Sequence, residues 1–256
     1  MSQPPNARRS RPAAPGLRRL KERARGLALT ALKWLGQDLD TVSLDGALRR
    51  CRQRTGAVGT VLDVGASDGR WTEVCRRYFP EAYYLLIEAQ RPHEPALAAL
   101  KRSSANLDYV IAAAGDTQGE IYFDATDLLG GIASHTPFPE NGITVPVTTL
   151  DREVQQRRLA PPYFLKLDTH GFEVPILAGA RATLAQTALL MIETYNFNFS
   201  AENLRFHQMV AHLETLGLRC VDLCDPLPRR RDGALWQFDL FFAPANSPTF
   251  ASESYY

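Results

Sequence analysis

The sequence has few cysteines, little net charge and no long apolar run. No window approaches the roughly eighteen consecutive apolar residues that a membrane-spanning helix needs, so we predict no transmembrane segment. The four cysteines of the 256-residue chain form no C-x-x-C pair and follow no secretory signal, which predicts reduced thiols and a cytoplasmic protein. With 45% apolar residues, the chain can still bury a core large enough for one domain with an appendage.

Basic and acidic residues are unevenly distributed, although the formal net charge is only +1. Residues 1–36 contain nine Lys or Arg and one acid, whereas residues 37–256 contain 20 basic and 27 acidic residues. An acidic body repels phosphate, and no N-P-P-Y-like block follows the fourth predicted strand. We therefore predict that nucleic acid is not a partner.

The composition divides the chain into three predicted segments. Residues 1–16, rich in Pro and Arg, are predicted to be a disordered basic arm. Residues 17–56 are predicted to be an N-terminal helical extension, because apolar residues recur there at helical spacing opposite Arg and Lys. This helix suits packing on the main domain, an acidic partner or peripheral contact with an anionic membrane, and packing is favoured. The Arg-rich start also resembles a transit peptide. Residues 57–256 form the main domain.

A glycine-rich bend between two apolar runs dominates the main domain. Residues 61–71 spell VLDVGASDGRW, and the apolar run at 83–89 ends in Glu88 and an alanine. This order is typical of a nucleotide-binding β-α-β unit, in which Gly65 and Gly69 allow a tight bend and close approach to a ligand. Glu88, at the end of the second strand, is placed to accept hydrogen bonds from both ribose hydroxyls. The alternative is an ordinary strand-helix junction with two turn glycines.

The glycine spacing favours a methyl donor over a dinucleotide. A dinucleotide site needs G-x-G-x-x-G, but Ala66 and Ser67 occupy the positions where the pyrophosphate would approach. Asp63 would repel a phosphate but would suit a cationic amino group. S-adenosylmethionine carries an amino group, a sulfonium and a ribose but no phosphate, so this pattern favours it over NAD.

Acidic residues end four predicted strands of the main domain. Besides Asp63 and Glu88, Asp168 ends a predicted strand over residues 163–168. Glu193 lies near the end of a predicted strand over residues 188–196. Carboxyl ends of parallel strands meet at one crevice, so these acids are expected to lie together and to need cations. The cations can be the donor, Lys166 or a divalent metal. Asp168, Glu193 and Asn196 are the candidate ligands for Mg²⁺.

Two histidines are candidate bases for methyl transfer to a hydroxyl. His170 follows the strand end at Asp168, and histidine is the side chain whose ordinary pKa best suits a base at neutral pH. His135 is the second choice, because it lies in an insertion over residues 121–147 that either covers the cleft as a lid or forms a plain surface hairpin. Alternatively, His170 makes only a backbone hydrogen bond, and Asp168 orients it or binds the donor's amino group.

Alternation along the whole domain predicts an α/β fold. Strands are expected at residues 107–115 and 163–168, with a helix over 172–184, and a final strand over 236–244 closes an antiparallel hairpin. The predicted architecture is the class I, Rossmann-like methyltransferase fold, a seven-stranded, mostly parallel sheet with an antiparallel last strand and helices on both faces.

Several motifs together resemble the FkbM family of S-adenosylmethionine-dependent methyltransferases. They are LDVGASDGRWT, LLIEAQ, AAAGDTQGEI, VPVTTLD, FLKLDTHGFEVPILAGA and LLMIE, within about residues 58–243. The resemblance implies O-methylation, typically of a sugar or natural-product hydroxyl. It implies that Asp63, Gly65 and Gly69 hold the methionine end of the donor, Glu88 the ribose, and Asp116 or its neighbours the adenine. The complete predicted donor site comprises Asp63, Gly65, Ala66, Ser67, Asp68, Gly69, Glu88, Ala89, Ala113 and Asp116.

Two hypotheses from different classes follow. The first is a catalytic O-methyltransferase that acts on a small-molecule acceptor. The second is a non-catalytic scaffold protein that keeps the fold and is recruited through its basic N-terminal helix. The intact set of Asp63, Gly65, Gly69 and Glu88 favours the enzyme.

Overall fold

The computed structural model describes residues 39–140, 142–200 and 202–255. The chain divides into two units, Met1–Thr41 and Val42–Tyr256. The predicted basic arm and residues 17–38 of the predicted helical extension lie outside the described residues. A short 3₁₀ helix, η1 (Leu39–Val42), precedes the second unit. None of the described helices has the length and apolar character needed to cross a bilayer.

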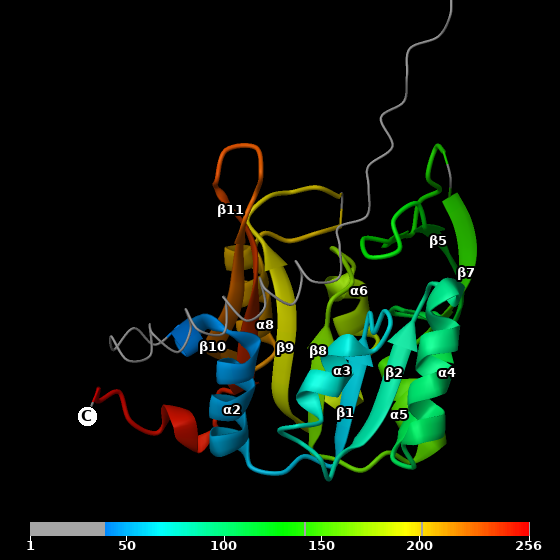
Figure 1. Cartoon of the computed structure of the whole chain (residues 1–256). Helices are drawn as coiled ribbons and strands as arrows, with labels where there is room; N and C mark the ends of the chain where they lie inside the picture. Colours follow the sequence, from blue (N-terminus) through cyan, green and yellow to red (C-terminus); the bar gives the residue numbers. More distant parts are fainter. Residues whose placement is uncertain (1–38, 141, 201, 256) are drawn as a thin grey trace, which may run out of the picture. The chain divides into compact units, whose positions relative to one another are not determined.

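A seven-stranded sheet organises the second unit (Figure 1). Its order is β10-β11-β9-β8-β1-β2-β3. The pairs from β9 through β3 are parallel, and β11 is antiparallel to both of its neighbours. The predicted architecture is confirmed. The strands are β1 (Thr60–Val64), β2 (Tyr83–Glu88), β3 (Leu107–Ile111), β8 (Tyr163–Leu167), β9 (Thr187–Tyr195), β10 (Leu218–Pro228) and β11 (Leu235–Pro244).

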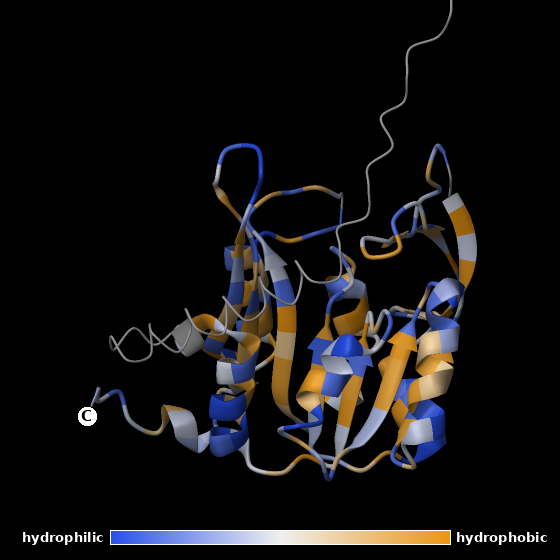
Figure 2. Cartoon of the chain, in the orientation of Figure 1, coloured by the Kyte–Doolittle hydropathy of each residue, from blue (hydrophilic) through white to orange (hydrophobic). Residues whose placement is uncertain are grey.

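Both faces of this sheet are buried, so its central strands are mostly apolar, as Figure 2 shows. On β1, Val61 belongs to one apolar core and Leu62 to the other, as alternation along a strand requires. The first core includes residues of α2 (Leu44–Thr55), α3 (Arg70–Cys75) and α4 (Glu94–Ser103). The second core includes residues of α5 (Leu150–Arg157), α6 (Glu173–Ala178) and α8 (Phe206–Thr215).

Helix α2 belongs to the main unit, although the sequence placed it in the N-terminal extension. It begins at the N-cap Ser43, whose side chain accepts a hydrogen bond from the Gly46 backbone N–H. Ala47, Leu48 and Cys51 are fully buried against the sheet. The main unit therefore begins before the boundary predicted at residue 57.

The helix predicted over residues 172–184 is two helices, α6 and α7 (Arg181–Leu184). The break lies at Gly179, where an added Cβ would come within 2.1 Å of the carbonyl oxygen of Gly115. Because the main chain of another segment occupies this space, the helix cannot continue with an ordinary side chain there.

The insertion forms a separate four-stranded sheet in the order β4-β7-β5-β6. The strand predicted over 107–115 is divided between the two sheets, because β3 ends at Ile111 and the Ala112 N–H donates to the Glu88 carbonyl. The chain then pairs with β7. The strands of this sheet are β4 (Ala113–Ala114), β5 (Gly119–Asp124), β6 (Ile132–Ser134) and β7 (Gly142–Thr148). Two further 3₁₀ helices are η2 (Arg91–His93) and η3 (Pro248–Phe250).

Candidate active site

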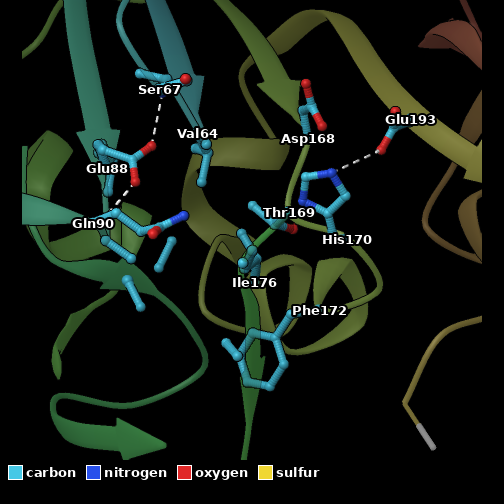
Figure 3. Close-up of a pocket in the computed structure, with 18 of the residues that line it drawn as sticks. Val64, Ser67, Glu88, Gln90, Asp168, Thr169, His170, Phe172, Ile176 and Glu193 are labelled. Atoms are coloured by element: carbon cyan, nitrogen blue, oxygen red, sulfur yellow. Dashed lines mark hydrogen bonds and ion pairs between the residues drawn. The ribbon is translucent and has the colours of Figure 1, made fainter. Parts of the chain in front are cut away.

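A cavity of about 310 Å³ lies where β1, β2, β8 and β9 end. This is the edge at which open α/β sheets bind ligands. The insertion contributes to its wall through Phe123, Leu128 and Ala133, so the insertion lines the cavity and is not a plain surface hairpin. Figure 3 shows Glu88 and Gln90 on one side of the cavity and Asp168, His170 and Glu193 on the other.

The structure brings most of the predicted site residues to this cavity and leaves others outside it. Those that line it are Gly65, Ala66, Ser67, Glu88, Ala89, Ala113, Asp168, His170 and Glu193. Those outside its wall are Asp63, Asp68, Gly69, Asp116, His135 and Asn196.

Glu88 is held in one orientation by two backbone N–H groups. It is the last residue of β2, and its side chain is buried. Its Oε2 accepts a hydrogen bond from the Ser67 N–H at 2.7 Å, and its Oε1 accepts one from the Gln90 N–H at 2.7 Å. A carboxylate oxygen can accept more than one hydrogen bond, so both oxygens keep capacity for the two hydroxyls of a ribose.

The two loop glycines are required by contacts within the protein. Gly65 has φ 74°, and an added Cβ would lie 1.9 Å from the carbonyl oxygen of Asp168. Gly69 has φ 84°, and its Cβ would lie 2.2 Å from a methyl group of Leu100. These contacts give each glycine a reason within the protein, and Gly65 also lines the cavity, whereas Gly69 does not. That the two glycines make room for a ligand stays a prediction.

Asp63 is fully buried and its cationic partner is Lys166. The Lys166 Nζ lies 3.0 Å from one Asp63 oxygen and 3.5 Å from Asp168, and it donates to the Gly65 carbonyl at 2.8 Å. The other Asp63 oxygen accepts from the Thr72 hydroxyl at 2.6 Å. These contacts confirm the predicted Lys166 ion pair but correct the role of Asp63. Because it is sealed from the cavity, Asp63 cannot touch the donor's amino group directly.

Asp168, Glu193 and His170 form an acidic cluster beside the cavity. The His170 Nε2 lies 3.9 Å from Glu193 Oε2. Glu193 also accepts hydrogen bonds from the Tyr195 hydroxyl and from Nε2 of Gln237 on the adjacent strand β11. Glu193 is therefore held between two donors while its carboxyl group faces Asp168.

The pKa values of Asp168 and Glu193 are shifted in opposite directions. Burial, then the negative charge of Asp168, raises the pKa of Glu193 well above its usual value. Burial opposes ionisation of Asp168 too, but the Lys166 ammonium and His170 hold the pKa of Asp168 below its usual value. Burial and the closeness of the two carboxyl groups therefore favour ionisation of Asp168 over ionisation of Glu193.

The turn that carries His170 has an uncommon backbone conformation. His170 has φ 53° and Gly171 has φ 97°, both in the left-handed region. A non-glycine residue is uncommon in this region, and its backbone strain persists only where the surrounding structure holds the residue in place. The turn brings the imidazole from the end of β8 back toward Glu193 (Figure 3).

The structure brings together two of the three predicted magnesium ligands, Asp168 and Glu193. Asp168, His170 and Glu193 each place one ligand atom within 4.8 Å of the others. Asn196, however, lies outside the cavity wall, and its side-chain amide donates to the Leu235 carbonyl. The oxygen-rich set that Mg²⁺ prefers is therefore incomplete.

His135, Asp116 and Asp68 make surface contacts instead of lining the cavity. His135 places one ring nitrogen 3.4 Å from Asp116 and the other 3.4 Å from Glu202. Asp68 pairs with Arg70 through both carboxylate oxygens, at 2.9 and 2.6 Å. These hydrogen bonds lower the pKa of Asp68. The structure thus supplies protein partners for three predicted site residues.

Three residues of the cavity wall carry unpartnered polar atoms, and two of them were absent from the predicted site. Ser67 Oγ, which was predicted, and Trp71 Nε1 and Gln90 Oε1, which were not, are buried and have no hydrogen-bond partner among the described residues. Buried polar atoms without partners are uncommon in folded proteins. Their convergence on one cavity indicates a site for a polar ligand. Gln90 was detectable in principle, because it lies only two residues after Glu88, just beyond the end of β2.

Asp239 is expected to make the stability of the protein depend on pH. It lies on β11 opposite Glu193, and burial together with the charge of Asp168 raises its pKa to about 8. A raised pKa in the folded state contributes stability that is present below the unfolded value and is lost as pH rises through the folded value. Between about pH 4 and pH 8 the wild-type protein should lose up to about 1.4 kcal/mol per pH unit relative to Asp239→Asn. Urea unfolding of both proteins at pH 5, 6.5 and 8 measures this difference, and parallel pH profiles would contradict it.

The sheet order and the cavity at its carboxyl edge define the class I methyltransferase architecture, in which an antiparallel strand is inserted next to the fifth parallel strand. The profile of the methyltransferase FkbM domain matches residues 63–220. The chain therefore belongs to the FkbM methyltransferase family, a family of S-adenosylmethionine-dependent enzymes.

The chain is similar to many solved structures, among them the following two. The methyltransferase FkbM from Methylobacillus flagellatus KT is 18% identical, with a TM-score of 0.47, and the match covers 72% of this chain and 43% of that one. The chain thus spans less than half the length of that protein. A Burkholderia thailandensis 1,6-didemethyltoxoflavin-N1-methyltransferase, crystallised with 1,6-didemethyltoxoflavin and S-adenosylhomocysteine, is 16% identical, with a TM-score of 0.43 and 93% coverage of both chains. At these identities the likeness concerns the fold alone. No curated protein matches the chain by sequence.

Proposed function

We propose that the chain binds S-adenosylmethionine in this cavity and transfers its methyl group to a hydroxyl of a small-molecule acceptor. The donor supplies a methyl group on a sulfonium, which leaves as a neutral thioether. Glu88 would hold the ribose, and the unpartnered atoms of Ser67 and Trp71 offer further polar contacts. The proposed donor carries no phosphate, so the acidic residues at the cavity do not repel it.

The observation that carries the proposal is the Asp168–Glu193–His170 cluster at the wall of the donor cavity. The hydroxyl oxygen forms a bond to the methyl carbon as the carbon–sulfur bond breaks, and the hydroxyl proton passes to the His170 imidazole. Glu193, whose Oε2 lies 3.9 Å from the His170 Nε2, and the neighbouring Asp168 would stabilise the imidazolium that forms. Methyl transfer is an in-line displacement, and the remaining rate enhancement comes from positioning.

Magnesium takes no part in the proposed mechanism. Asn196 donates to the Leu235 carbonyl and lies outside the cavity wall. The Lys166 ammonium already lies 3.5 Å from Asp168, as well as 3.0 Å from Asp63. The predicted cytoplasmic location remains a prediction. Membrane contact by the N-terminal helix also remains a prediction, because that helix lies outside the described residues.

An aromatic cluster follows Glu193 in the chain. Phe197 stacks on Trp236 with ring centroids 5.4 Å apart, and Tyr195 meets Phe199 edge-on at 4.5 Å. Arg229 covers the Phe197 ring at 4.1 Å. These residues lie outside the cavity wall and pack against one another, so the cluster supports the segment that follows Glu193.

Replacing His170 by glutamine is expected to lower the rate of methyl transfer about 100-fold, because the hydroxyl loses its base. The affinity for S-adenosylhomocysteine should change less than threefold, since His170 does not hold the ribose. Transfer of labelled methyl from S-adenosylmethionine to a panel of small hydroxyl compounds measures the rate, with EDTA or Mg²⁺ added in parallel. A larger loss in His135→Gln, or a rate restored only by Mg²⁺, would contradict the assignment.

A further inference from the structure

The side-chain amide of Gln90 is fixed by the insertion. Its Nε2 donates to the carbonyl oxygens of Asp127 and Leu128, at 3.0 and 3.1 Å. A carbonyl oxygen can only accept, so the atom that faces both must be the amide nitrogen and not the amide oxygen. The remaining atom, Oε1, therefore has a defined position and is available only as an acceptor.

Gln90 Oε1 is buried at the cavity wall without a partner. The residue is 6% exposed, and none of the described residues donates a hydrogen bond to this oxygen. Figure 3 shows the Gln90 amide next to Glu88, whose Oε1 accepts from the Gln90 backbone N–H. A buried acceptor that belongs to a cavity-lining residue and lacks a protein partner suits a ligand that donates to it.

The surroundings of Gln90 suit a flat aromatic base. Glu88 and Gln90 line the same cavity, so a nucleoside whose ribose is bound by Glu88 can extend its base toward Gln90. Gly131 closes this wall, since an added Cβ there would lie 2.6 Å from the Phe123 ring and 2.8 Å from Gln90 Nε2. The other residues of this part of the wall are apolar: Ile87, Ala112, Ala113, Phe123, Leu128 and Ala133.

We propose that Gln90 is the residue that recognises the purine of the methyl donor, by accepting a hydrogen bond from its 6-amino group. The inference rests on the proposed function, because it assumes that the donor occupies this cavity. It also gives the insertion a role: the loop carbonyls of Asp127 and Leu128 hold the Gln90 amide in the orientation that exposes Oε1 to the base. Gln90 is thus a specificity-determining residue, oriented by a segment outside the main sheet.

This assignment replaces Asp116, which the family resemblance placed on the adenine side. Asp116 lies outside the cavity wall, and its side chain is 40% exposed and paired with His135. A hydrogen bond from a ligand amine to a water-exposed carboxylate that already has a protein partner contributes little binding free energy. A hydrogen bond to the buried, unpaired Gln90 oxygen contributes more, because this oxygen gives up no other partner.

The experiment is a cycle of two proteins and two ligands. S-adenosylhomocysteine and its counterpart with unsubstituted purine, which lacks the 6-amino group, are titrated calorimetrically into the wild-type protein and into Gln90→Met. The wild type should bind S-adenosylhomocysteine about tenfold more tightly than the purine counterpart. The counterpart cannot donate a hydrogen bond to Gln90 Oε1, so this buried acceptor stays unpaired in the second complex. In Gln90→Met this ratio should fall to about one, since the acceptor is gone from both complexes.

The ratio separates recognition from structural damage. If Gln90→Met merely loosens the insertion, both ligands weaken equally and the ratio keeps its wild-type value, which would overturn the proposal. A ratio that collapses in Asp116→Asn but persists in Gln90→Met would overturn it too. Failure of the wild type to bind S-adenosylhomocysteine would contradict the proposed function itself, whereas binding without discrimination contradicts only the role of Gln90.

Discussion

Replacing Lys166 by methionine should lower the free energy of unfolding by about 3–5 kcal/mol, the cost of leaving a buried charge without its partner. The substitution keeps the length of the side chain but leaves the fully buried Asp63 carboxylate with the Thr72 hydroxyl as its side-chain partner. It also removes the donor to the Gly65 carbonyl and the cation that faces Asp168. Urea-induced unfolding followed by circular dichroism at neutral pH measures the loss.

The matched control removes both charges. The double variant Asp63→Asn with Lys166→Met leaves no buried charge unpaired, so it should be more stable than Lys166→Met alone. A single variant that loses less than about 1 kcal/mol would contradict the assignment, because that is the range of an exposed ion pair. A double variant that loses the sum of the two single losses would show that the two groups do not interact.

Replacing Glu88 by glutamine should weaken binding of S-adenosylmethionine about 100-fold, because hydrogen bonds to a charged acceptor are each worth about 1.5–3 kcal/mol. The two backbone N–H groups of Ser67 and Gln90 point at the Glu88 oxygens, so an amide nitrogen placed there would face a donor. The carboxylate also loses its charge toward the ribose hydroxyls. Calorimetric titration of S-adenosylmethionine and S-adenosylhomocysteine into both proteins measures the effect.

Asp68→Asn provides the comparison at a nearby acid. It makes the same change of charge on the loop that carries Ser67, but Asp68 lies outside the cavity wall and pairs with Arg70. The loss of donor affinity should therefore be below threefold. If Glu88→Gln and Asp68→Asn lost equal donor affinity, the effect would come from negative charge near the loop, and Glu88 would make no specific contact with the donor. If the wild type binds neither ligand, the proposed function fails and the non-catalytic scaffold hypothesis takes its place.

Local sequence patterns determined the main sheet and the edge at which the site lies. Apolar runs that end in Glu88 and Asp168, with helices between them, are enough to predict parallel strands and the crevice at their carboxyl ends. The same patterns placed His170 and Glu193 at that edge, where the structure also places them. These features depend on residues close together in the chain, so periodicity and turn chemistry suffice.

Contacts between distant segments decided which predicted residues reach the cavity. Asp63 ends its strand like the other acids, but its side chain meets Lys166 of the neighbouring strand β8 and is sealed from the cavity. Asp116 and His135 pair with each other because the insertion folds as its own sheet. Gln90 became a site residue only through two carbonyl groups more than thirty residues further along the chain.

The sequence by itself thus determined the fold class, the family and the strand ends that surround the donor. Only the tertiary structure decided the partner of each buried polar group. The physical reason is that a strand is specified by its own alternation of side chains, whereas the cost of burying a charge or an amide depends on which group from another segment lies against it.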